Sequence, residues 1–184
     1  LSHLSSRCVS CLLARSTFID WIESAKRQLT YLEERCDSII IIGFSMGGLI
    51  GVNLSIGKDN IKKLILINTP YKYWNFPQIF KNLKNDFKNF SKRYILNIIK
   101  IPFRTLINFK KILNKTKKLF PKVKSKVYIF QTLDDDTVKP KSKDLIYNNI
   151  KGEKYIKKYK TGGHKVLISD NKIIFKDIEK ILSS

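Results

Sequence analysis

The sequence predicts an α/β fold, with a parallel sheet of about four strands, flanking helices and an inserted helical cap. Short runs rich in Ile, Val and Leu recur along the chain, as expected of strands that are buried in a parallel sheet. Segments with the apolar period of a helix alternate with these runs. Between the second and third runs a long stretch interrupts the alternation, and it exceeds an ordinary crossover connection.

The chain is predicted to begin with an irregular tail, residues 1–15, which shows no clear period and contains no Lys, Asp or Glu. One domain is expected over residues 16–184. It opens with an amphipathic helix, because apolar side chains recur at helical spacing up to Leu32. Thr17, followed three residues later by Asp20, resembles a capping box. The helix is expected to end near Arg35.

Four apolar segments predict the strands. Residues 38–42 read as a strand that is buried on both faces, and residues 62–70 and 126–132 read as two further strands. Residues 154–160 are less apolar and predict a fourth strand at an edge of the sheet. Because helices separate these segments, the strands are expected to run parallel with right-handed crossovers.

Helices are predicted between and after the strands. One begins around Ser45, one is opened by Pro140 and covers residues 142–150, and the last covers residues 171–182. Residues 73–119 are predicted to form the inserted cap, with two or three helices. Its periodic apolar positions include Ile79, Leu83, Phe87 and Phe90.

The formal net charge is +21, and residues 72–126 supply +15 of it, from 16 Lys and Arg against one acid, Asp86. Such a charge can indicate binding to nucleic acid or to an anionic membrane. A Lys, Ile and Asn bias of the kind that AT-rich coding sequences produce explains it equally well. The favoured interpretation is a solvated basic surface without nucleic acid as a partner, and peripheral membrane contact is left open.

The three cysteines, Cys8, Cys11 and Cys36, are too few for a disulfide framework. Cys8 and Cys11 have the spacing of a redox or zinc motif, but there is no second pair. Because the cysteines are so few, a reducing, cytoplasmic setting is expected. No apolar run reaches the length needed to span a bilayer, so a soluble protein is expected.

A lone serine stands between glycines where the first strand should meet its helix. G-x-S-x-G after a strand and before a helix is the pattern of a nucleophile elbow, and Gly43 to Gly47 match it around Ser45. The strained turn needs small neighbours, which Gly43 and Gly47 provide. The N–H of Met46 would face a developing oxyanion. The alternative is a glycine-rich turn with an incidental serine.

A serine nucleophile needs a general base and an orienting carboxylate. Of the two histidines, His3 lies in the tail, whereas His164 lies in a Gly-Gly loop after the last strand. The carboxylate should follow the third strand, where Asp134, Asp135 and Asp136 stand in a row. A surface histidine and solvated loop acids are the alternatives. Such a site needs no metal and no organic cofactor.

Three motifs together, GFSMGG, QTLDDDTVKP and GGH, resemble the α/β-hydrolase superfamily in its bacterial carboxylesterase and monoacylglycerol lipase branch. The branch carries a D-x-x-V-x-P signature, which fits residues 135–140 and implies Asp135 as the triad acid. The resemblance implies hydrolysis of carboxylic esters through an acyl-enzyme, with a cap over an apolar acyl pocket. Phe44, Tyr73 and Trp74 are expected to contact the substrate.

The resemblance also implies an eight-stranded sheet in which the elbow follows the fifth strand. In this sequence one helix and the tail precede the elbow, so a partial α/β-hydrolase fold is expected, with the nucleophile strand left as an apolar edge. The loop that supplies a second oxyanion N–H should then be missing, and losing such a donor costs about 2.7 to 4 kcal/mol. Alternatives are a polyanion- or membrane-binding module without catalysis, a peptidase or a thioesterase.

Overall fold

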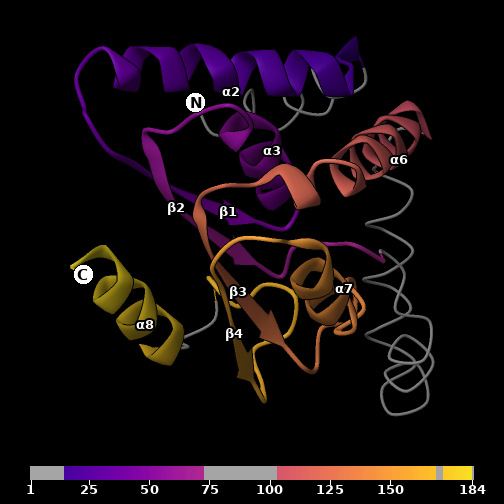
Figure 1. Ribbon diagram of the computed structural model, residues 1–184. Coiled ribbons are helices and arrows are strands. Elements are labelled where there is room, and N and C mark those ends of the chain that lie inside the picture. Colours follow the sequence, from indigo (N-terminus) through magenta and orange to yellow (C-terminus); the bar gives the residue numbers. More distant parts are fainter. Residues whose placement is uncertain (1–14, 73–102, 169–171, 184) are drawn as a thin grey trace, which may run out of the picture.

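The computed structural model describes residues 15–72, 103–168 and 172–183. In them, four strands form one sheet in the order β1-β2-β3-β4, and each neighbouring pair is parallel (Figure 1). The strands are β1 (Ile39–Phe44), β2 (Ile61–Ile67), β3 (Lys126–Thr132) and β4 (Lys154–Tyr159). The predicted parallel α/β architecture is confirmed, and so is the edge position of the fourth strand.

The second strand ends three residues earlier than the sequence predicted. The backbone at Asn68 has a φ of 46°, which turns the chain out of the extended conformation. Pro70, two residues later, has no N–H to give to a ladder. The strand therefore stops at Ile67.

Helices cover both faces of the sheet (Figure 1). Leu64 and Leu66 of β2 face α3 (Met46–Ser55) and α7 (Ser142–Asn149), in a core cluster that includes Val52, Ile146 and Phe120. The alternate β2 residues, Ile65 and Ile67, pack with α8 (Lys172–Leu182) in a second cluster, which includes Ile174, Ile178 and Ile181. The α7 helix begins two residues after Pro140, at Ser142.

The first described helix, α2 (Phe18–Glu33), carries the predicted capping box. Thr17 N donates to Asp20 Oδ2 over 2.7 Å, and Asp20 N donates to Thr17 Oγ1 over 3.3 Å. The buried side chains Ile22 and Leu29 lie on the face that packs against α3 and the sheet. The capping box is confirmed, and so is the apolar stripe as far as Leu29, whereas Leu32 at its predicted end is 43% exposed.

Part of the predicted cap is described, namely α6 (Phe103–Lys117), and the short 3-10 helix η1 (Phe120–Lys122) follows directly after the predicted cap. The α6 helix packs on α2 and α3 through Ile112 and Leu113, which contact Ile22 and Leu49. The remainder lies outside the described residues, including Tyr73, Trp74, Ile79, Leu83, Phe87 and Phe90. The cap over residues 73–119 therefore stays a prediction.

In the described part of the chain, β1 pairs with β2 alone and so forms the other edge of the sheet. Ile39 is buried, but Ile42 remains 45% exposed. The prediction that this strand is buried on both faces is wrong at Ile42, because a run of isoleucines looks the same at an edge as in the middle of a sheet. The apolar edge expected from the family resemblance is present.

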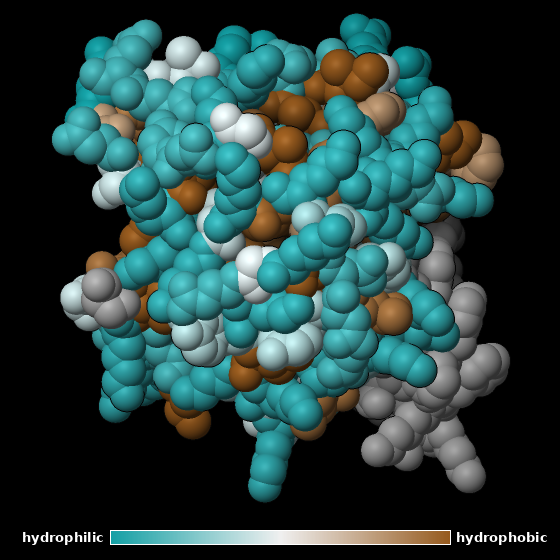
Figure 2. All heavy atoms as spheres, in the orientation of Figure 1, coloured by the Kyte–Doolittle hydropathy of each residue, from teal (hydrophilic) through white to brown (hydrophobic). Residues whose placement is uncertain are grey.

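Hydrophilic residues cover most of the face seen in Figure 2, with hydrophobic ones between them. Among the described residues, none of the helices has both the length and the apolar run that crossing a bilayer requires.

Candidate active site

Ser45 occupies the sharp turn between β1 and α3. Its backbone has a φ of 51° and a ψ of −119°, a conformation that a residue with a Cβ adopts only under strain. Its N–H donates to Ile67 O over 2.8 Å, so the turn is tied to the end of β2. The backbone is thus strained at the residue where the G-x-S-x-G pattern predicts a sharp turn.

At the turn around Ser45, Gly43 and Gly48 are the glycines that lie close to neighbouring atoms. A Cβ at Gly43 would lie 2.5 Å from Gly48 Cα, and one at Gly48 would lie 1.9 Å from Thr69 Oγ1. A Cβ at Gly47 would meet no atom of the described residues within 4 Å. Among the described residues, close contacts therefore require a small residue at Gly43 and Gly48, and the expectation for Gly47 stays a prediction.

His164 lies beside Ser45, although 119 positions separate them in the chain. Its Nε2 is 3.0 Å from Ser45 Oγ, and its Nδ1 is 2.9 Å from Asp135 Oδ2. An ionised carboxylate can only accept, so Nδ1 donates to Asp135 and Nε2 is left to accept from the serine hydroxyl. The Phe44 ring lies 5.2 Å from the imidazole, between centroids.

The three consecutive aspartates have different surroundings. Asp135 is fully buried, and its Oδ1 accepts from the N–H groups of Thr137 and Val138, each over 2.8 Å. Asp134 accepts instead from the loop that carries His164, and Asp136 accepts from the Thr137 hydroxyl over 3.1 Å. Of the three, Asp135 is the one bonded to the His164 ring.

Met46 is the first residue of α3, so helix geometry gives its N–H no acceptor within the helix. The positive end of the helix dipole also lies at this position. Both features suit an N–H group that donates to a negatively charged oxygen beside Ser45.

The sequence reasoning missed Asn68, a fully buried residue at the end of β2. Its side chain bonds to the ends of two segments, Thr132 on β3 and the backbone of Gly163 and His164. A local signal was available for the turn alone, because asparagine takes a positive φ more readily than most residues, but no such signal indicated its hydrogen-bond partners.

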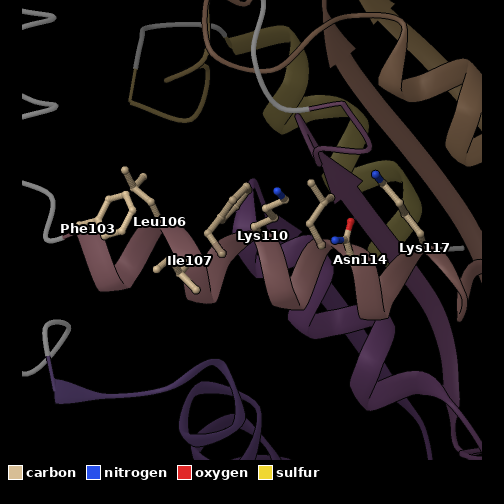
Figure 3. Close-up of a pocket in the computed structure, with 8 residues that line it drawn as sticks. Phe103, Leu106, Ile107, Lys110, Asn114 and Lys117 are labelled. Atoms are coloured by element: carbon tan, nitrogen blue, oxygen red, sulfur yellow. The ribbon is translucent and has the colours of Figure 1, made fainter.

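A groove of about 560 Å³ runs along α6. Figure 3 shows that Phe103, Leu106 and Ile107 line one part of it, with Lys110, Asn114 and Lys117 further along the helix. Phe109 and Leu113 complete the described lining. This groove lies on the described part of the predicted cap.

Within residues 15–72, 103–168 and 172–183, the acids, histidines and cysteines form no group of three or more that could hold a metal ion. The chemistry open to the arrangement is proton transfer. Ser45, His164 and Asp135 form a continuous chain of hydrogen bonds, along which the imidazole can take the hydroxyl proton while the carboxylate accepts from the other ring nitrogen.

Residues 9–177 match the family model described as acetyl xylan esterase, AXE1. A thermostable monoacylglycerol lipase from Bacillus sp. strain H-257 is 25% identical over 163 residues, which cover 83% of this chain and 65% of that protein. The chain thus spans slightly less than two thirds of the length of this curated relative.

Solved structures show the same fold. A structure from the metagenome-derived lipolytic enzymes LipS and LipT has a TM-score of 0.74 at 22% identity, and the match covers 95% of this chain and 75% of that one. For the monoacylglycerol lipase of Paleococcus ferrophilus the TM-score is 0.68 at 13% identity, with coverages of 91% and 76%. The predicted α/β-hydrolase fold class and the esterase and lipase resemblance are confirmed.

Proposed function

Because the chain belongs to the acetyl xylan esterase family, we propose that it hydrolyses carboxylic esters through a covalent acyl-enzyme. The observation that carries the proposal is the position of His164, whose imidazole bonds to Ser45 on one side and to Asp135 on the other. The name of the Bacillus relative, a monoacylglycerol lipase, supports an ester with an apolar acyl group as the substrate.

In the proposed reaction Ser45 Oγ attacks the ester carbonyl carbon, and its proton moves to His164 Nε2. Asp135 holds the imidazole in the tautomer that can accept this proton and stabilises the imidazolium. The Met46 N–H donates to the oxyanion. His164 then gives the proton to the leaving alcohol, and the acyl group stays on Ser45. Water, deprotonated by His164, then attacks the acyl carbon, and the bond to Ser45 Oγ breaks as His164 returns the proton to that oxygen, which releases the acid and restores the serine.

The surroundings of the acyl group are also part of the proposal. Phe44 lies against His164 and would border the reacting ester. We assign Tyr73 and Trp74 to the same pocket, as part of the cap over residues 73–119. The apolar part of the α6 groove, around Phe103, Leu106 and Ile107, supports a cap that accepts an apolar chain (Figure 3).

A fluorophosphonate probe tests the nucleophile, since such probes phosphonylate activated serines. We expect intact-mass and peptide analysis to show a single adduct, on Ser45, and Ser45→Ala to prevent it. In parallel, p-nitrophenyl acetate, butyrate and octanoate measure hydrolysis, and Ser45→Ala should reduce kcat by at least about 1000-fold.

The proposal fails if the folded protein reacts with the probe no faster than Ser45→Ala does. An adduct on another residue would equally contradict the assignment of the nucleophile. Thermal unfolding of both proteins should show comparable Tm values, so that any difference in reactivity belongs to the hydroxyl and not to the fold.

A further inference from the structure

Asn68 stands between the end of the sheet and the loop that carries His164. It is 0% exposed, and its own N–H donates to Phe130 O over 2.8 Å, which joins the ends of β2 and β3. Its positive φ of 46° turns the side chain away from the course of the strand. A buried amide in such a conformation needs all its hydrogen bonds, because unpaired polar groups are costly inside a protein.

The two ends of the Asn68 amide have different partners. Oδ1 accepts from Thr132 N over 2.9 Å and from Gln131 Nε2 over 3.2 Å. Nδ2 lies 3.1 Å from Gly163 O and 3.2 Å from His164 O, to which it donates, and the Thr132 hydroxyl lies beside both ends of the amide, 3.0 Å from Nδ2 and 3.2 Å from Oδ1. Two donors face the oxygen and two carbonyl groups face the nitrogen, so the orientation of the amide is determined by its neighbours.

Other groups hold the same loop from the β3 side. The Thr132 hydroxyl donates to Gly163 O over 2.7 Å. Asp134 accepts from Gly163 N over 2.8 Å and from Gly162 N over 3.2 Å. Gly162 and Gly163 have φ values of 132° and 58°, in the region that favours glycine. Because two successive glycines have little intrinsic preference for one backbone conformation, the hydrogen bonds hold the loop in place.

We infer that Asn68 is a positioning residue, which sets the distance from His164 to Ser45 by holding the carbonyl groups of Gly163 and His164. This inference rests on the proposed function. The Asn68 amide bonds to the end of β3 and to the backbone of the loop, so it acts on the imidazole through that backbone. A displacement of about 1 Å between reacting groups can cost about 100-fold in rate, so the loss of this support should appear in kcat.

Two variants and one matched control test the inference. Asn68→Gly removes the amide and accepts the positive φ without strain. Asn68→Asp keeps the shape but turns an oxygen toward the two carbonyl groups. Ser125→Ala is the control, because the buried Ser125 hydroxyl also joins the two strands, donating to Ile61 O over 2.7 Å at their amino ends, opposite the site.

The readouts are kcat and KM for p-nitrophenyl butyrate, the rate of fluorophosphonate labelling, and Tm, with activity measured well below each Tm. We expect Asn68→Gly to lower kcat and the labelling rate by about 10- to 100-fold, with KM changed by less than about threefold. Asn68→Asp should be less active than Asn68→Gly. Ser125→Ala should lower Tm but leave kcat within about twofold of wild type.

Three results would overturn the inference. The first is a wild-type kcat in Asn68→Gly, and the second is a loss of kcat in Ser125→Ala as large as that in Asn68→Gly. The third is a higher activity in Asn68→Asp than in Asn68→Gly, which is expected if Asn68 contributes by packing alone. In each case a wild-type protein labelled on Ser45 leaves the proposed function standing. A wild-type protein that neither hydrolyses the ester nor reacts with the probe overturns both.

Discussion

Gly48 leaves no room for a methyl group beneath the elbow. A Cβ there would lie 1.9 Å from Thr69 Oγ1 and 2.8 Å from Thr69 Cγ2, and Thr69 is itself buried. We expect Gly48→Ala to lower the free energy of unfolding by about 1 to 3 kcal/mol, because Thr69 or the helix must shift. Urea denaturation at neutral pH measures the change.

Gly47→Ala is the matched control, one position earlier in the same helix. Its Cβ meets nothing within 4 Å among the described residues, and Ala favours a helix over Gly by up to about 1 kcal/mol. The control should therefore be neutral or slightly stabilising. Equal losses in the two variants would contradict the assignment of the close contact to Gly48.

At the scale of single residues, the sequence predicted the groups that come together at the site but not what holds them there. Ser45 and His164 could be found from the G-x-S-x-G pattern and from the shortage of histidines. The sequence pattern alone did not show which of the three aspartates bonds to His164, and the signature of the similar family indicated Asp135. Asn68 escaped notice because its role depends on three segments meeting in space, which no local pattern encodes.

At the scale of elements, one carboxylate joins α8 to β4. Asp177 accepts from Lys157 Nζ over 2.5 Å and from the Tyr159 hydroxyl over 2.8 Å. Burial raises the pKa of Asp177, but the hydrogen bonds from Lys157 and Tyr159 outweigh it and leave the pKa below its ordinary value. Burial and the bond to Asp177 raise the pKa of Tyr159.

A lowered pKa in the folded state means that Asp177 stabilises the fold above the pKa of an unfolded aspartate, about 3.9, and loses this effect as the pH falls through the folded value. Asp177→Asn should therefore lower stability at pH 7, by about 1 to 2 kcal/mol, and should differ less from wild type toward pH 3. Urea midpoints at pH 7, 5 and 3.5 test this.

Glu179→Gln on the same helix is the control for the change in charge, since Glu179 is exposed. It should change stability little at any of the three pH values. A difference between Asp177→Asn and wild type that grew toward low pH would contradict a lowered pKa of Asp177 in the folded protein.

The elements themselves were largely predictable, because both strand and helix leave a periodic pattern of apolar side chains. The pattern does not say what each apolar face will meet. For α6 it could not show that Ile112 and Leu113 pack on Leu49 and Ile22. The apolar run of β1 also did not show that this strand lies at an edge, as the exposure of Ile42 demonstrates, whereas the less apolar β4 could be placed at one.

At the scale of the whole molecule, the sheet follows the order of the chain, so β1 and β4 form its two edges among the described residues. The alternation of strands and helices predicted a parallel sheet, and the family resemblance predicted which strand would be left at an edge. The net charge of the chain follows directly from its sequence. The arrangement of hydrophilic and hydrophobic residues on the surface could not be predicted, because it depends on how the helices pack (Figure 2).

The bond between His164 and Ser45 joins two groups that follow opposite edges of the sheet, 119 positions apart. They become neighbours only after all four strands have paired, and pairings between distant parts of a chain are slow to form. During refolding from urea, fluorophosphonate reactivity should therefore return no earlier than far-UV circular dichroism, and an earlier return would contradict this order. The rate at which the probe labels Ser45 Oγ would then measure when pairing of all four strands is complete.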